Sequence, residues 1–424
     1  MAVVRQAGVL LLAALFMSRG LFAQDAETPD SATAWVRADS LTAPVPPLIV
    51  ADQARAALRP VEIRYVHQES LLGPVPRVIK GVYVNAWAFG SPKLWQLVRL
   101  ADETEINAFV IDVKDDTGCL LYPSAVPTAR HIGANDCVRA KDARARLDSL
   151  ALHGIYAIAR IVVAKDPLLA ERKPQWSVRD RRTGGLWRDR INSAWVDAYN
   201  DSVWIYAAQL AEEAVRLGFN ELQFDYVRFP DEPRERMATA IFPARQAGWT
   251  QREAVRDHIT LLRNRLRPLG VPVTFDIFGL TASTTVGDLG IGQVWEDFIN
   301  IADVVLPMVY PSHYYRGAFG VAWPNGEPYR VVRYALRDAL ERSRPHPAAA
   351  EIRPFLQAFT LGRRRPRYTP FEIREQIRAV EDAGLTSWVL WNPRSVYQRG
   401  ALRPHGGGAS PASEVLSSSD GGRY

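Results

Sequence analysis

Short apolar segments alternate with longer amphipathic segments along most of the chain. The short segments are rich in β-branched and aromatic residues, as strands are, whereas the longer ones have the 3.6-residue periodicity of helices. Eight segments are predicted as strands: 81–87, 108–112, 156–163, 221–229, 271–278, 304–310, 354–359 and 388–392. Seven segments are predicted as helices: 92–105, 140–153, 199–217, 252–269, 294–301, 329–343 and 370–383. This order is typical of repeated βα units with a parallel sheet.

The predicted fold class is α/β, a single-domain (β/α)8 TIM barrel, because eight parallel strands close most simply into a barrel. Glycine follows several predicted helices directly, at Gly154, Gly218, Gly270 and Gly384, as left-handed helix ends favour. A doubly wound open sheet is the alternative. No G-x-G-x-x-G loop follows the first predicted strand, so the sequence favours the barrel.

The two ends of the chain differ in composition from this repeating region. Residues 1–23 carry Arg5, an apolar run and then small residues, which predicts a secretory signal peptide, with an uncleaved anchor as the alternative. Residues 24–60 are rich in Ala and Pro and are interpreted as a flexible linker, and residues 404–424 as a disordered tail. We therefore expect the barrel over 61–403, in a protein exported to the periplasm or secreted, without stable membrane insertion.

Composition and charge narrow the class of partner. Hydrophobic residues make up 47% and charged residues 23% of the 424 residues, which is typical of a globular protein. The formal net charge of +6 suits an anionic partner. Nucleic acid is not expected, because no motif with base-reading geometry occurs. An acidic polysaccharide is compatible with the charge, and the sequence leaves the oligomeric state open.

Two cysteines, Cys119 and Cys137, fall in one predicted loop. In an oxidising compartment they are expected either to close this loop as a disulfide or to remain free thiols. The seven histidines include no H-x-H or H-E-x-x-H spacing, so a zinc or binuclear metal site is not expected. Hydrolysis by paired carboxylates needs no redox cofactor, and none is expected. A calcium ion near Asp112, Asp115 and Asp116 is an alternative without an EF-hand pattern to support it.

Carboxylates at predicted strand ends are the candidate catalytic residues, because the active site of a (β/α)8 barrel lies at the carboxyl ends of its strands. Asp112, Asp225 and Asp276 occupy such positions within apolar segments, where an unpaired carboxylate is costly. Glycoside hydrolysis requires a pair of carboxyls, one as nucleophile or base and one protonated as acid. The structural alternative is a buried ion pair of Asp225 with Arg160 or Arg228.

Other side chains near the strand ends are predicted to bind substrate. Strand alternation predicts that Asp112 and Lys114 share one face, and that Gln223, Asp225 and Val227 share another. The predicted substrate-binding residues are Lys114, Arg160, Arg228, Tyr310, His313, Gln357, Trp391 and Asn392. Aromatic residues in the loops after strands three and six are expected either to stack on sugar rings or to pack these loops: Trp176, Trp187, Trp195, Tyr314, Tyr315, Phe319 and Trp323.

Four segments carry a resemblance to a known family: V-K-D-D (113–116), Q-F-D-Y-V-R-F-P (223–230), M-V-Y-P-S-H (308–313) and W-V-L-W-N-P (388–393). Over about 78–395 the chain resembles the putative glycosyl hydrolase family of bacterial exported barrels, domain of unknown function 4015. That family is similar to α-amylase-like barrels. The resemblance implies Asp225 as nucleophile and Asp276 as general acid or base. Those barrels usually carry Glu on strand five, so Asp112 is the main alternative acid.

The sequence therefore predicts an exported glycoside hydrolase that cleaves a polysaccharide with paired carboxylates. A glycan-binding barrel without turnover is one alternative. An envelope protein whose Asp and Arg residues form structural ion pairs is another.

Overall fold

The structure, a computed structural model, describes residues 75–361 and 366–405. Eight parallel strands form a closed barrel: β1 (Lys80–Val84), β2 (Ala108–Lys114), β3 (Tyr156–Val162), β5 (Glu221–Asp225), β7 (Val273–Phe278), β8 (Val304–Met308), β10 (Phe355–Gln357) and β11 (Trp388–Trp391). The sheet closes because β11 pairs with β1 while β10 pairs with both β11 and β8. The predicted (β/α)8 fold is confirmed.

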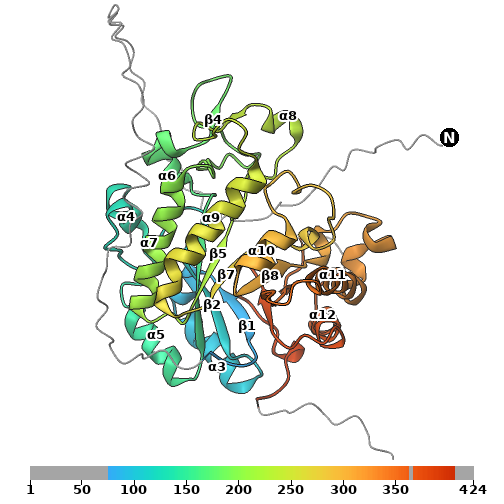
Figure 1. The fold of residues 1–424 in the computed structure, drawn as a ribbon. Helices are drawn as coiled ribbons and strands as arrows, with labels where there is room; N and C mark the ends of the chain where they lie inside the picture. The colour runs from blue at the N-terminus through green and yellow to red at the C-terminus, as the bar shows by residue number, and fades with distance from the viewer. Residues whose placement is uncertain (1–74, 362–365, 406–424) are drawn as a thin grey trace, which may run out of the picture. The chain divides into compact units, whose positions relative to one another are not determined.

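Helices cover the outside of the barrel (Figure 1). The main ones are α3 (Lys93–Glu103), α5 (Ala143–Leu152), α7 (Asp201–Leu217), α9 (Gln251–Leu266), α10 (Trp295–Ile301), α11 (Pro328–Ser343) and α12 (Pro370–Asp382). Each lies within a few residues of a predicted helix. Capping boxes begin α9 at Thr250 and α12 at Thr369, and Gly218 ends α7 in the left-handed conformation (φ 114°).

Shorter elements lie in the loops between these units. They are α2 (Ala86–Phe89), α4 (Pro127–His131), α6 (Pro167–Arg172) and α8 (Arg234–Met237), the antiparallel pair β4 (Arg179–Asp180) and β6 (Ala240–Ile241), and β9 (Glu351–Ile352) beside β8. Several strand predictions were too long, two of them by three residues or more at a boundary that matters for the site. The segment 81–87 ends as a strand at Val84 and continues into α2, and the segment 221–229 ends as a strand at Asp225.

Strand alternation divides the apolar side chains between two cores. Val110, Ile158 and Leu306 point into the barrel, where they form one buried cluster with other inward side chains. The intervening residues, such as Phe109 and Phe224, pack against the helices in a second and larger cluster. The barrel interior is thus filled with side chains, and the polar residues that it carries near the carboxyl ends of the strands need specific partners.

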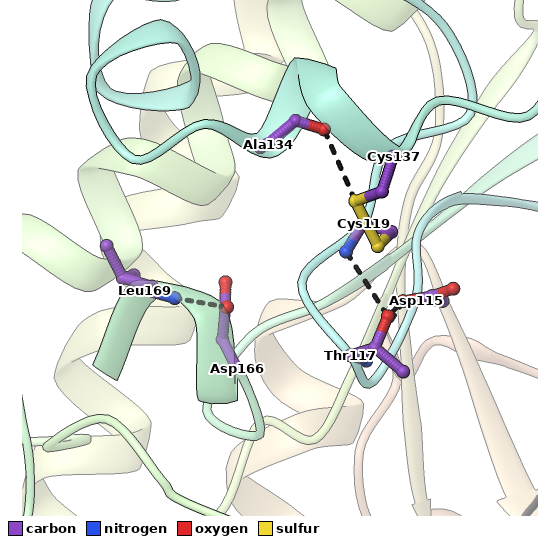
Figure 2. The surroundings of a disulfide bond; sticks show 7 residues. All are labelled: Asp115, Thr117, Cys119, Ala134, Cys137, Asp166 and Leu169. Atoms are coloured by element: carbon purple, nitrogen blue, oxygen red, sulfur yellow. Dashed lines mark hydrogen bonds between the residues drawn. A yellow bond between two sulfur atoms is a disulfide. The ribbon is translucent and has the colours of Figure 1, made fainter. Parts of the chain in front are cut away.

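A disulfide joins Cys119 to Cys137 within the connection from β2 to β3, with a Cα–Cα distance of 5.5 Å (Figure 2). The sequence left open whether these cysteines form a disulfide, and the structure shows that they do.

Removing this disulfide in the double variant Cys119→Ser/Cys137→Ser is expected to lower the free energy of unfolding by about 3 kcal/mol, because the unfolded chain gains the entropy of the opened loop. The cysteines are separated by 18 residues. Denaturant unfolding of the oxidised wild type and the variant measures the difference. The wild type treated with reductant serves as a control and should match the variant; equal stability of all three forms would contradict the expectation.

Several predictions concern residues outside 75–361 and 366–405. They are the signal peptide (1–23), the linker (24–60), the beginning of the expected barrel domain (61–74) and nearly all of the predicted tail (404–424). No helix in the described part of the chain combines the length and the apolarity needed to cross a membrane.

Candidate active site

Arg160 is the centre of a buried charge cluster at the carboxyl ends of β2, β3, β5 and β7. Its Nη1 donates to Oδ1 of Asp112 at 2.5 Å, and its Nη2 and Nε donate to Oδ2 of Asp225 at 2.5 and 3.2 Å. The same Nε lies 3.7 Å from Oδ2 of Asp276. The four residues are between 1% and 5% exposed. The three carboxylates predicted as catalytic residues therefore meet around one cation.

The cluster holds three carboxyl groups and one guanidinium, so a proton on one carboxyl reduces the repulsion among them. Burial and the neighbouring charge of Asp225 raise the pKa of Asp276 well above its usual range. Burial raises the pKa of Asp112 to about 6, although Arg160 and a hydrogen bond from Tyr83 oppose this shift. Asp276 is accordingly the carboxyl best suited to carry the proton.

Arg160 remains the fixed cation of this cluster. Burial alone would lower its pKa, but Asp112 and Asp225 raise the pKa of the guanidinium above its ordinary value. The register of the barrel explains the contacts, because Arg160 on β3 lies opposite Asp112 on β2 and opposite Gln223 on β5. Its inward side chain thus reaches carboxylates on both neighbouring strands.

Asp225 ends β5 and accepts hydrogen bonds on both carboxylate oxygens. Besides the bonds from Arg160, its Oδ1 accepts from the backbone amide of Tyr226 at 2.6 Å. Tyr226 has a φ of 55°, a left-handed conformation that is unfavourable for an aromatic residue and that ends the strand here. Val227 therefore lies beyond the strand and in the outer core, and the prediction that it shares a face with Asp225 is wrong.

Gln223 lies one inward position below Asp225 and orients Asp276. Its Nε2 donates to the two carboxyl oxygens of Asp276 at 2.9 and 3.0 Å. The predicted shared face of Gln223 and Asp225 is confirmed by these inward contacts. The amide thereby fixes the orientation of the Asp276 carboxyl between β5 and β7.

Aromatic side chains line the other side of the cluster. The hydroxyl of Tyr83 donates to Oδ2 of Asp112, and its ring stacks on Trp391 with centroids 3.9 Å apart. The Arg160 guanidinium lies 5.2 Å from the Trp391 ring, and Tyr310 stacks on the same ring at 6.4 Å. Trp391 and Tyr310 thus lie beside the cluster, and their contact with substrate stays a prediction. The sequence analysis did not identify Tyr83 as a site residue. Alternate residues of β1 point into the barrel, and Tyr83 is one of them.

Lys114 does not join the cluster. The pairing of β2 with β3 is irregular between Asp112 and Lys114, which directs Lys114 outward to the helices. Its Nζ forms an ion pair with Asp166 at 2.5 Å and lies 5.4 Å from the ring of Tyr206 on α7. The prediction that Lys114 shares a face with Asp112 is wrong, and the contacts give Lys114 a structural role in place of the predicted substrate contact.

Gln357 and Asn392 hold loops at the strand ends. The Gln357 side chain accepts from the amide of Ser312 at 3.0 Å and donates to the carbonyl of Phe359. The Asn392 side chain donates to the carbonyl of Ala358 at 2.7 Å. The side-chain amides of Gln357 and Asn392 were expected to bind sugar hydroxyls, but here they form hydrogen bonds within the protein. Substrate binding by either residue stays a prediction.

His313 packs its ring against the rings of Tyr310 and Phe359, with centroids 5.4 and 6.2 Å away. Its Nδ1 lies 3.0 Å from the hydroxyl of Ser312. Burial lowers the pKa of His313 to about 4, so the imidazole is neutral at pH 7. A neutral ring beside Tyr310 suits a hydrogen-bonding role, and its contact with substrate stays a prediction.

Arg228 is surrounded by aromatic side chains. Its guanidinium is 5.2 Å from the ring of Trp195, 4.8 Å from Tyr226 and 4.6 Å from Phe278. Its Nη1 donates to the carbonyl of Phe229 at 3.0 Å. The sequence suggested a buried ion pair of Asp225 with Arg160 or with Arg228. The ion pair with Arg160 forms, and the described residues contain no ion pair between Asp225 and Arg228.

The aromatic residues of the loops after the third and sixth barrel strands divide into two groups. Trp187, Trp195 and Tyr314 are buried and Trp176 and Phe319 are partly buried against the outer core, so these five pack the loops. Tyr315 and Trp323 are about half exposed, which leaves them available to a ligand.

The acidic residues suggested as calcium ligands have separate partners. Asp116 forms an ion pair with Lys165 at 2.7 Å, and Asp115 accepts the amide of Thr117 at 2.9 Å. No group of three His, Cys, Asp or Glu side chains suited to a metal ion occurs in the described ranges. These contacts give the calcium alternative no support.

Comparison with known proteins identifies the family. Residues 81–397 match the family described as a putative glycosyl hydrolase domain. Among solved structures, a hypothetical protein from Ruminiclostridium thermocellum ATCC 27405 is 36% identical, with a TM-score of 0.41 over 46% of this chain and 96% of that chain. The glycoside hydrolase domain of PgaB from Bordetella bronchiseptica is 15% identical, with a TM-score of 0.52 over 75% of this chain and 95% of that chain. This second similarity supports the fold alone. A comparison with curated proteins found no match.

Proposed function

This chain belongs to the putative glycosyl hydrolase family, and we propose that it is an exported enzyme that cleaves a polysaccharide with Asp225 as nucleophile and Asp276 as general acid. The observation that carries the proposal is the contrast between the two carboxyls. Asp225 accepts hydrogen bonds from Arg160 and Tyr226, whereas burial and the charge of Asp225 raise the pKa of Asp276. One ionised and one protonated carboxyl are what glycoside hydrolysis uses.

In the first step, Asp276 donates its proton to the glycosidic oxygen while an oxygen of Asp225 attacks the anomeric carbon. The bond to the leaving sugar breaks, and an ester between the sugar and Asp225 forms. In the second step, the Asp276 carboxylate takes a proton from water as that water attacks the anomeric carbon. The ester breaks, and both carboxyls return to their starting states. Arg160 and the amide of Tyr226 hold Asp225 in orientation for both steps.

We favour this double displacement because the two carboxyls lie close to the same nitrogen of Arg160. Oδ2 of Asp225 lies 3.2 Å and Oδ2 of Asp276 lies 3.7 Å from the same Nε of Arg160. Retaining enzymes have carboxyls about 5–5.5 Å apart, and inverting enzymes about 6.5–9.5 Å apart. Two oxygens this close to one nitrogen reach the longer separation only if the angle that they make at that nitrogen is wide. Retention of anomeric configuration is therefore the expected outcome.

A reducing-end assay on a panel of polysaccharides tests the function. The panel contains peptidoglycan glycan strands, acidic exopolysaccharides and neutral glucans, each incubated with purified protein. The proposal predicts release of reducing ends from at least one polymer. Binding without release from any polymer would instead support the alternative of a glycan-binding barrel.

Turnover is expected to fall as the pH rises through the pKa of Asp276, because the acid must be protonated to assist the leaving group. That pKa is raised, so the fall lies above the usual range of aspartate. Asp276→Asn should remove this alkaline limb and lower kcat about 10²–10⁴-fold with a sugar leaving group. Glycosides with a nitrophenolate leaving group should lose much less in the first step. A pH profile of kcat for wild type, Asp276→Asn and Asp112→Asn checks the assignment; loss of the limb in Asp112→Asn alone would move the acid role to Asp112.

The proposed function includes export of the protein from the cytoplasm. The disulfide between Cys119 and Cys137 supports it, because disulfides persist mainly in oxidising compartments. The apolar run before residue 23 is the corresponding sequence feature.

A further inference from the structure

Trp87 is an exposed tryptophan at the catalytic end of the barrel. It lies on α2, which follows the carboxyl end of β1 directly, and 66% of its surface is exposed. Among the tryptophans in residues 75–361 and 366–405, none is more exposed. Its place directly after a barrel strand, in a loop at the carboxyl end of the barrel, leaves the exposed part of the indole accessible to a ligand.

Arg139 covers part of the Trp87 indole and is itself held in place by the fold. Its guanidinium carbon lies 3.8 Å from the centre of the Trp87 ring. Its backbone amide donates to the carbonyl of Leu121 at 3.1 Å, and the disulfide at Cys137 anchors the chain two residues earlier (Figure 2). The carbonyl of Arg139 packs so closely on Gly90 that a Cβ there would lie 2.2 Å from it. The pair is therefore preorganised.

The charge of Arg139 is not neutralised by a direct ion pair. In the part of the chain that the structure describes, no carboxylate lies within 4.0 Å of its guanidinium, and its Nε is shielded from water without a hydrogen-bond partner. A guanidinium without an ion-pair partner suits a carboxylate of a ligand, which it binds through two parallel hydrogen bonds.

The pair also lies in loops at the barrel end that carries the cluster around Arg160. Burial raises the pKa of Asp115, and the attraction of Arg139 opposes that shift. Asp115 in turn is one of the charges that raise the pKa of Asp112 in the cluster around Arg160. Trp87 follows β1 and Arg139 lies in the connection that follows β2, so both belong to loops after the carboxyl ends of the first two barrel strands.

We propose that Trp87 and Arg139 form an outer glycan subsite that binds a uronate residue of the polysaccharide chain. The exposed part of the indole stacks on the apolar face of the pyranose ring, and the guanidinium binds its carboxylate. This inference rests on the proposed function, since it assumes a polysaccharide substrate. It adds a substrate class, an acidic glycan, and a binding position outside the carboxyls that react.

Binding of acidic polysaccharides to Trp87→Ala and Arg139→Gln tests the subsite. The probes are polygalacturonate, alginate and hyaluronan in affinity gel electrophoresis, with dextran as a neutral probe. Trp87→Ala should weaken binding to at least one acidic polymer about tenfold. Arg139→Gln should weaken binding of the same polymer and leave dextran unaffected, because it removes the charge that pairs with the uronate.

Trp95→Ala is the matched control. Trp95 on α3 is also exposed, at 37%, and also lies near an arginine, with Arg146 5.9 Å from its ring. Its loss should leave binding unchanged. Wild-type affinity of Trp87→Ala, or no binding of any acidic polymer by the wild type, would overturn the subsite. If binding depends on Trp87 but no reducing ends are released, the proposed hydrolase activity is contradicted and the subsite is not. If Trp87→Ala hydrolyses an acidic polymer and binds it with wild-type affinity, the subsite is contradicted and the hydrolase activity is not.

Discussion

Asp225→Asn is expected to lower kcat about 10⁴-fold, as loss of a central catalytic side chain does in other hydrolases. The amide has nearly the same shape as the carboxylate but is a poor nucleophile. Glycan affinity should stay within a few-fold of the wild type, because the substrate contacts remain. Steady-state kinetics and binding measurements on the same polymer separate the two effects.

Glu221→Gln is the matched control for this variant. Glu221 begins the strand that Asp225 ends, and it is also buried and paired with an arginine, Arg353, at 2.7 Å. Both substitutions remove a buried charge from β5, but only one does so at the catalytic end. Glu221→Gln should lower the melting temperature and leave kcat of the folded enzyme nearly unchanged. Equal losses of kcat in the two variants would mean that Asp225 acts through stability, as in the structural alternative.

Arg160→Met is expected to lower the free energy of unfolding by about 3–5 kcal/mol at neutral pH, since breaking a buried ion pair leaves its partner charge uncompensated. Here one guanidinium faces three carboxyls, and all four groups are almost fully buried. Denaturant unfolding of wild type and variant at several pH values measures the loss.

The loss should depend on pH in a definite direction. Arg160 opposes the burial that raises the pKa of Asp112 and Asp276, so its removal raises these pKa values further. A carboxyl with a raised pKa in the folded state costs no stability below its unfolded pKa, about 3.9, and destabilises as the pH rises through its folded pKa. The variant should therefore approach wild-type stability near pH 4 and be weakest at pH 8. The same loss at both pH values would show that packing, and not charge, is what Arg160 provides.

The periodicity of the sequence was sufficient to predict the barrel and most of its helices. Eight apolar segments became the eight barrel strands, because burial on both faces leaves a signal that does not depend on distant contacts. The meeting of Asp112, Asp225 and Asp276 was also predictable, because parallel strands of a closed barrel bring their carboxyl ends together.

Local backbone irregularities account for the failures. An irregular pairing after Asp112 directs Lys114 to the helices, and a left-handed Tyr226 ends β5 four residues before the predicted end. Neither irregularity occurs at a glycine, so the residue types do not predict a break in the strand there. Tyr83 was missed for another reason: an aromatic residue on an inward face is usually core, and its hydroxyl contact with Asp112 depends on a neighbouring strand. Arg160 was predicted to contact substrate, with an ion pair to Asp225 as the structural alternative. The pair forms, the register of the strands places Arg160 between three carboxyls, and its contact with substrate stays a prediction.

The most direct test of the central claim is to identify the residue that carries the sugar during the reaction. Asp276→Asn lacks the base for the second step, so an aryl glycoside of the sugar that the wild type releases should leave the ester intermediate accumulated on the enzyme. Acid quenching, proteolysis and mass spectrometry then locate the added mass. The account predicts a glycosyl group on Asp225. A glycosyl group on Asp112, or inversion of the anomeric centre without any adduct, would contradict it.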